Sequence, residues 1–146
     1  MMIVKMSESH IPQIAELERL CFNDPWSENS IASELGNKLS LWLVAEHEGQ
    51  VLGYVGSQTV LGETDMMNIA THPDFRKQGI GTALIRALID ALSAAGSHSL
   101  MLEVRASNDP AISVYEKMGF IQVGIRKNYY RNPKEDALIL RKEWEL

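Results

Sequence analysis

The chain has 146 residues, of which 45% are hydrophobic and 23% charged, and this composition is typical of one globular domain with a substantial core. The formal net charge of -5 argues against non-specific binding of nucleic acid, and no apolar run is long enough to span a membrane. The single cysteine, Cys21, excludes an internal disulfide, and the N-terminus lacks the apolar core of a signal peptide, so we expect a cytoplasmic protein.

The first half of the chain has the periodicity of four strands and two helices. Ser9 is expected to cap the first helix, whose apolar residues recur at helical spacing up to Cys21. Ser27 is expected to cap the second helix. Glu48-Gly49 marks a hairpin turn between two of the strands. We predict these strands at residues 2–6, 40–46, 50–59 and 66–71.

The second half alternates helices and strands. A helix is predicted at residues 82–95 and a strand at 99–105, and this strand should run parallel to the strand at 66–71. Asn108 or Asp109 should cap another helix, which Gly119 ends. Two further strands are expected at 120–125 and 136–142, joined by a loop at 128–133.

The predicted element order is β-α-α-β-β-β-α-β-α-β-β. It indicates an α/β fold with a single domain over residues 1–146, in which helices flank a mixed, mostly antiparallel central sheet.

The most distinctive pattern in the chain precedes the helix at 82–95. It reads Arg-Lys-Gln-Gly-Ile-Gly from Arg76 to Gly81. Glycines before a helix let backbone N–H groups approach a ligand, and the helix N-terminus adds partial positive charge. The loop therefore suits an anion such as a pyrophosphate. The simpler alternative is an ordinary connection whose glycines serve packing, and the pattern is neither a Walker A loop nor a dinucleotide-binding fingerprint.

Two residues are candidates for acid–base chemistry. Glu103 lies in the middle of a predicted strand and points away from Leu102 and Val104, so it must be paired or functional if that face is covered. It either pairs with Arg105 on the same face or acts as a general base. Tyr115 lies on an inward helical stripe and is either a packed core residue or a proton donor.

For other residues, the sequence pattern alone favours structural roles. Trp26 lies in the loop between the first two helices, where it either seals the helix pair or walls a peptide site. The four histidines are scattered without metal-ligand spacing, so we expect surface residues and no metal site. They are His10, His47, His72 and His98.

Several motifs together resemble the GNAT family of N-acetyltransferases, and within it the bacterial ribosomal-protein-alanine N-acetyltransferases (RimI type). The Arg-x-x-Gly-x-Gly loop indicates the superfamily. Motifs spread over almost the whole chain narrow the resemblance to the N-terminal acetyltransferase branch. They are Pro25-Trp26-Ser27, Asn68-Ile69-Ala70, Leu102 to Asn108, Ala111 to Phe120 and Arg126-x-Asn128-Tyr129-Tyr130.

The resemblance implies a GNAT-like fold and a role for each matching position. Glu103 would be the general base for the substrate amine, and Tyr115 the general acid for the CoA thiolate. Trp26, Tyr129 and Tyr130 would border the peptide groove. The residues implied in acetyl-CoA binding are Ile69, Ala70, Thr71, Arg76, Lys77, Gln78, Gly79, Ile80, Gly81, Thr82 and Asn108.

The implied activity is transfer of acetyl from acetyl-CoA to a protein N-terminus, with the N-terminal alanine of a small-subunit ribosomal protein as acceptor. An α-amine has a pKa of about 7.7–8.0 and needs a weaker base than a lysine at about 10.4, so a single carboxylate suits it better. Two alternatives stay open: a GNAT enzyme acting on a lysine or small amine, and a non-catalytic acyl-CoA-binding module. We expect no direct nucleic-acid or membrane partner, and a monomer is favoured over an oligomer.

Overall fold

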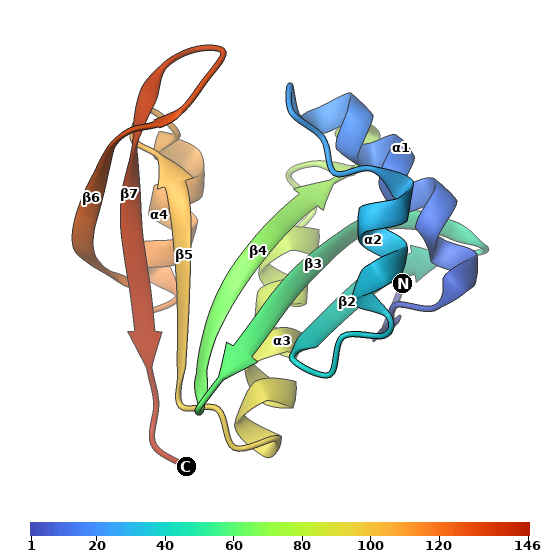
Figure 1. Ribbon diagram of the computed structural model, residues 1–146, viewed down its shortest axis with the longest axis horizontal. Helices are drawn as coiled ribbons and strands as arrows, with labels where there is room; N and C mark the ends of the chain where they lie inside the picture. The colour runs from blue at the N-terminus through green and yellow to red at the C-terminus, as the bar shows by residue number, and fades with distance from the viewer.

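A seven-stranded sheet organises the chain, with its strands in the order β1-β2-β3-β4-β5-β7-β6 (Figure 1). The structure is a computed structural model that describes residues 1–146. The strands are β1 (Met2–Lys5), β2 (Ser40–His47), β3 (Gln50–Val60), β4 (Glu63–Thr71), β5 (Ser99–Arg105), β6 (Ile121–Tyr130) and β7 (Glu135–Glu143). The helices are α1 (Ile11–Cys21), α2 (Glu28–Glu34), α3 (Ile80–Ala94) and α4 (Asp109–Lys117), with short 3-10 helices η1 (Glu8–His10) and η2 (Pro73–Phe75).

The pairing of the strands confirms the predicted α/β fold and element order. All neighbouring strands are antiparallel except β4 and β5, which are parallel. The exception arises because α3 carries the chain from the end of β4 back to the start of β5, which is the connection that parallel strands require.

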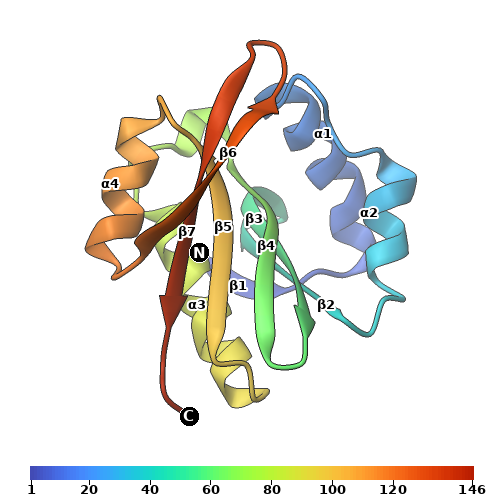
Figure 2. The ribbon, with the colours of Figure 1, turned by 60° about the vertical axis from the view of Figure 1, so that its left-hand side comes forward.

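Helices cover both faces of the sheet (Figures 1 and 2). α3 packs on one face of β2, β3 and β4, and α1 packs on the opposite face of β3 and β4. Side chains alternate accordingly along β2: Leu43 and Ala45 belong to the core beneath α3, whereas Trp42 and Val44 belong to the core beneath α1. Two separate cores thus determine the face to which each strand side chain points.

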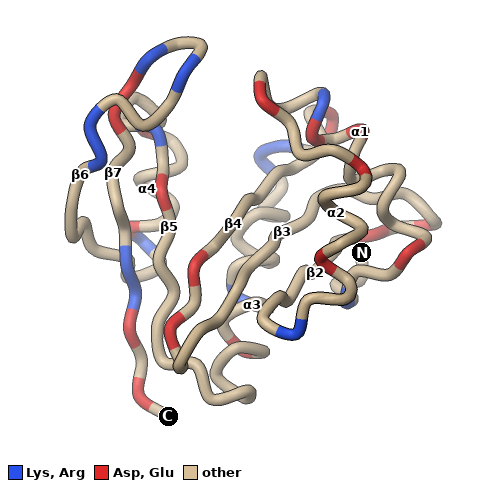
Figure 3. The backbone as a smooth tube through the Cα atoms, viewed as in Figure 1, with Lys and Arg blue, Asp and Glu red and all other residues tan.

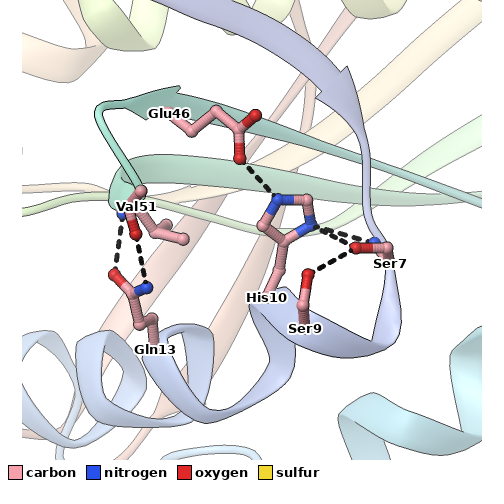
Figure 4. A network of polar contacts seen from close by, with 7 residues as sticks. Ser7, Ser9, His10, Gln13, Glu46 and Val51 are labelled. Atoms are coloured by element: carbon pink, nitrogen blue, oxygen red, sulfur yellow. Dashed lines mark hydrogen bonds and ion pairs between the residues drawn. The ribbon is translucent and has the colours of Figure 1, made fainter.

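A hydrogen-bond network joins the start of α1 to β2 (Figure 4). The backbone N–H of Ser7 donates to Nδ1 of His10 (2.9 Å), and Nε2 of His10 lies 2.7 Å from Oε2 of Glu46. Because Nδ1 accepts, the remaining Nε2–H donates to Glu46. Two predictions are wrong here: Ser7 rather than Ser9 takes the N-cap position before η1, and His10 is buried rather than exposed.

The predicted caps of the two short helices are confirmed. The side chain of Ser27 accepts from the N–H of Ser30 at the start of α2. The side chain of Asn108 accepts from the N–H of Ala111 at the start of α4. Each cap satisfies a backbone donor that has no partner within its helix, which explains why these positions are readable from sequence.

Three predicted boundaries are wrong. β4 begins at Glu63 rather than at 66, and the missed residues are those that pair with β5. α3 begins at Ile80 rather than at 82, because Gly79 takes the N-cap position with a φ of 79°. β6 continues to Tyr130, where a loop at 128–133 was expected. The register passes from Arg126 opposite Ala137 to Tyr130 opposite Glu135, so β6 carries extra residues relative to β7. The turn-forming residues therefore make a bulge inside the strand instead of ending it.

No helix of the structure is long and apolar enough to cross a membrane. No three His, Cys, Asp or Glu side chains come together in an arrangement that could hold a metal ion.

Candidate active site

The candidate site lies where β4 and β5 part. The two strands pair at only three positions, from Glu63 opposite Ser99 to Asp65 opposite Met101. Beyond this point β4 stays paired with β3, and β5 stays paired with β7, so the sheet opens between them (Figure 1). A cavity of about 750 Å³ occupies the opening.

The cavity is lined by β4, β5, α4, the α1–α2 connection and the end of the β6–β7 hairpin. Its lining brings together Glu103, Tyr115, Asn108, Ile69, Trp26, Tyr129 and Tyr130, seven of the residues predicted from sequence. The other predicted residues, Ala70, Thr71 and Arg76 to Thr82, lie outside this lining.

The cavity joins the two faces of the sheet. Ile69, Val104 and Tyr115 belong to the core on the α3 side. Glu103 alternates with Leu102 and Val104 and so points to the opposite face, the side on which Trp26 packs with the α1 core. A molecule bound on the α3 side can therefore meet one bound on the α1 side within the opening.

Glu103 lies in an ion pair, but not with the predicted alternative partner. Its Oε1 lies 3.2 Å from Nε of Arg126 on β6. Arg105 instead pairs with Glu135 (3.3 Å) on β7. A side-chain hydrogen bond with Glu103 is the main cause that raises the pKa of Tyr129, ahead of burial and the charge of Glu103. The β6 bulge thus brings a cation and a phenol to this carboxylate.

Tyr115 presents its phenol to the cavity. The residue is 7% exposed, and its ring packs edge-on against Phe120, with centroids 5.6 Å apart. Its hydroxyl makes no hydrogen bond, yet no fully buried side-chain oxygen or nitrogen lacks a partner, so this hydroxyl reaches the cavity. Burial, and then the charge of Tyr130, raise the pKa of Tyr115 to about 12. The phenol is therefore a neutral proton donor at physiological pH.

Aromatic residues form the outer walls of the cavity. Tyr129 and Tyr130 pack edge to face at the end of β6 (5.1 Å), and the guanidinium of Arg105 lies over the ring of Tyr130 (4.3 Å). Across the opening, the ring of Trp26 packs against Trp42 (5.4 Å). Trp26 therefore both seals the α1 core and walls the cavity, so its two predicted roles are compatible.

A hydrogen bond joins the two outer walls of the cavity. Nδ2 of Asn23, in the α1–α2 connection, donates to the carbonyl oxygen of Asn132 in the β6–β7 turn (2.5 Å). Figure 3 shows both basic and acidic positions along the β6–β7 hairpin, which include Arg131, Lys134, Glu135 and Asp136, and Asp24 follows Asn23 in the sequence. A single side-chain hydrogen bond thus bridges the mouth of the cavity.

The loop before α3 offers free backbone donors. No loop, turn or capping hydrogen bond is donated by the amides of Arg76 to Thr82, and the first bond of the helix runs from Ala83 N–H to the carbonyl oxygen of Gly79 (3.0 Å). A Cβ at Gly79 would meet nothing within 4 Å, so the space beside this residue is open. This arrangement fits an anion such as a pyrophosphate.

The side chains around that loop have partners of their own. The guanidinium of Arg76 contacts the carbonyl oxygen of Thr71 (3.4 Å) and Sγ of Cys21 (3.5 Å). The side chain of Ala70 is buried in the α1 core, so only its main chain is available. Because His72 N–H bonds to Leu52 of β3 (2.7 Å), the alternation along β4 turns the main chain of Thr71 toward the opening.

A buried carboxylate that sequence reasoning missed supports two walls of the site. Glu18 on α1 is 0% exposed and accepts hydrogen bonds from Tyr54 Oη, Asn68 Nδ2 (2.6 Å) and the N–H of Trp26 (2.8 Å). A signal was present in the sequence, because Glu18 interrupts the apolar stripe of α1 beside Leu17. Burial raises the pKa of Glu18 and outweighs the hydrogen bonds from Tyr54 and Trp26, which lower it.

Comparison with known proteins gives one consistent result. Residues 11–120 match the model of the family described as "Acetyltransferase (GNAT) family". The chain is 38% identical over 140 residues to the [ribosomal protein bS18]-alanine N-acetyltransferase of Escherichia coli (strain K12), covering 94% of each chain. The enzyme of that name from Haemophilus ducreyi is 36% identical, with 95% of this chain and 97% of the other covered.

The solved structures agree with these relatives. The crystal structure of the ribosomal-protein-S18-alanine N-acetyltransferase from Escherichia coli superposes with a TM-score of 0.91. It is 36% identical in sequence, and the match covers 99% of this chain and 94% of the other.

The raised pKa of Glu18 predicts a measurable pH dependence of stability. An acid whose pKa is raised on folding contributes stability that is present below its ordinary pKa of about 4.3 and is lost as the pH rises through the folded value. The melting temperature of the natural protein, relative to that of Glu18→Gln, should therefore fall as the pH rises from 4 to 8. Calorimetry at fixed salt measures it. A shift in the natural protein's favour would mean that the hydrogen bonds outweigh burial.

Proposed function

The chain belongs to the acetyltransferase (GNAT) family, and we propose that it transfers acetyl from acetyl-CoA to the N-terminal α-amine of a protein. We infer from the names of the Escherichia coli and Haemophilus ducreyi relatives that the acceptor is the N-terminal alanine of the ribosomal protein bS18. The observation that carries this proposal is the cavity at the parting of β4 and β5, which joins the two faces of the sheet and holds a carboxylate and a phenol.

Acetyl-CoA supplies the thioester, and the α3 side of the sheet suits it. The free amides of Arg76 to Thr82 would hold the pyrophosphate, with help from the charge of Lys77. The main chain of β4 from Ile69 to Thr71, which has no strand partner on this edge, would pair with the pantetheine arm. Asn108 lines the cavity and would contact the same arm.

The acceptor would enter from the α1 side. Trp26, Tyr129 and Tyr130 would border the peptide, and Glu103 would take a proton from its amine, directly or through water. An α-amine with a pKa of about 7.7–8.0 gives up this proton near neutral pH to a modest base. Arg126, 3.2 Å from Glu103, also disfavours a positively charged amine in this position and so favours the nucleophilic neutral form.

The reaction then needs one addition and one elimination. The amine nitrogen bonds to the thioester carbon, main-chain N–H groups stabilise the oxyanion, and the C–S bond breaks. Tyr115 protonates the leaving sulfur. Because its pKa of about 12 exceeds that of a thiol at about 8.5, Tyr115 gives up its proton as the C–S bond breaks rather than to a free thiolate. The proton that Glu103 took from the amine then returns through water to the phenolate, so the net transfer is from amine to thiol. Much of the acceleration comes from holding the amine against the thioester.

Acetylation of two short peptides tests the acceptor class. One peptide begins with a free alanine, and the other has a blocked N-terminus and an internal lysine. We expect mass spectrometry to find acetyl on the alanine amine alone, because a single modest base such as Glu103 suits an α-amine with a pKa of about 7.7–8.0 better than a lysine at about 10.4. Acetyl on the lysine would contradict the proposal, and acetyl-CoA binding without transfer to either peptide would leave a small-amine substrate or a non-catalytic module.

Replacement of the base tests the mechanism. Glu103→Gln should lower turnover by about 100-fold or more, the range in which general bases contribute, while acetyl-CoA affinity changes little. Glu63→Gln is a matched control, because Glu63 also lies on a strand in an ion pair (Arg141, 3.1 Å) but does not line the cavity. Steady-state kinetics with the alanine peptide and calorimetric titration of acetyl-CoA measure both effects. Undiminished turnover in Glu103→Gln would remove this residue as the base.

A further inference from the structure

Glu18 is the buried ionisable group that the proposed reaction does not use. Removing a carboxylate from water costs free energy, and the three hydrogen-bond donors around Glu18 offset part of that cost. Those donors come from three separate elements: Tyr54 from β3, Asn68 from β4 and the N–H of Trp26 from the α1–α2 connection. Its neighbours on the same stripe, Ile14 and Leu17, are apolar.

Two of the three donors belong to the walls of the cavity. Trp26 lines its acceptor side, and Asn68 lines it at the edge of β4. Asn68 also accepts from the N–H of Ile69 through its Oδ1 (3.1 Å). The same short segment contains a bulge, because Met66 pairs with Ser57 and Asn68 with Gly56, which leaves one extra residue in β4.

We propose that Glu18 is a positioning residue for the acetyl transfer, which ties the β4 bulge at Asn68 and the acceptor wall at Trp26 to one buried anchor. This inference rests on the proposed function. Glu18 does not line the cavity. It sets the distance between the wall that receives the amine and the strand whose main chain borders the thioester.

A second buried carboxylate shows what a purely structural role looks like. Glu34 on α2 is 7% exposed and accepts from Trp42 Nε1 (3.3 Å), Ser40 Oγ (3.1 Å) and Gln58 Nε2 (3.1 Å). None of these partners lines the cavity. Glu34 therefore matches Glu18 in burial and in the number of element-bridging hydrogen bonds, but not in its connection to the site.

Glutamine at position 18 keeps the shape of the side chain and removes its ability to satisfy all three donors. It offers one acceptor oxygen and places an NH₂ group where a second acceptor stood, so at least one donor loses its partner. The bulge and the Trp26 connection would then relax relative to each other. Displacements of about 1 Å can cost up to about 100-fold in rate when reactants must be held in contact.

The experiment compares Glu18→Gln with Glu34→Gln in steady-state acetylation of the alanine peptide, below the melting temperature of each variant. For Glu18→Gln we expect kcat to fall by about tenfold or more, with little change in the KM for acetyl-CoA, because the amides of the loop at 76–82 are not touched. For Glu34→Gln we expect a lower melting temperature with kcat preserved. Equal losses of kcat in the two variants at equal losses of stability would overturn the proposal.

A measurement without substrates separates this inference from the proposed function. In ¹H–¹⁵N spectra, the backbone amides of Trp26 and Ile69 should shift in Glu18→Gln and stay in place in Glu34→Gln. Unmoved amides in Glu18→Gln would overturn the positioning role even if the natural protein acetylates no peptide. If Glu18→Gln does not fold, Asn68→Ala decides: kcat should fall in the same way, and an unchanged kcat would overturn the proposal.

Discussion

The candidate site exists because β4 and β5 pair over a short stretch and then part. Three parallel pairs join the strands, and each strand then keeps only its other neighbour. The main chain of β4 beyond Asp65 therefore presents to the opening an edge that no other strand pairs with. Backbone N–H and C=O groups are costly when buried without a partner, so an opening of this kind is suited to an extended ligand that pairs with the strand. The opening also connects the two faces of the sheet.

Two bulges hold the walls of the opening, and side-chain hydrogen bonds support both. In β4, the extra residue beside Asn68 lies next to the contact of Asn68 with Glu18. In β6, the extra residues around Asn128 are held by a hydrogen bond from its N–H to Oδ1 of Asp136 (2.8 Å), with Asn128 at a φ of 55°. Bulges bend a strand and turn its side chains. The β6 bulge is what brings Arg126 and Tyr129 to Glu103.

Short-range features of this fold could be predicted from the sequence, whereas its long-range contacts could not. The caps at Ser27 and Asn108 depend on residues three positions away, and the glycine loop depends on its own backbone, so both are visible locally. The resemblance of spaced motifs placed Glu103, Tyr115, Trp26, Tyr129 and Tyr130, and the structure gathers all five around one cavity.

Several failures share a physical cause, since they depend on a partner distant in sequence. His10 is buried because Glu46, 36 residues later, accepts its Nε2–H. Arg105 was the nearest cation to Glu103 on the same strand face, but Glu135 and Tyr130 hold it, and Arg126 takes its place. No glycine or proline marks the β4 bulge, so the parting of the sheet has no sequence signal of its own.

The most direct test of a passage between the two faces is a crystal structure with a bisubstrate inhibitor that joins CoA to the amine of an alanine peptide. The CoA should lie on the α3 side with its pyrophosphate on the amides of Arg76 to Thr82. The peptide should lie on the α1 side between Trp26 and Tyr129, and the linking carbonyl should lie in the opening near Glu103 and Tyr115. Both halves on one face of the sheet, or binding outside the opening, would contradict this arrangement.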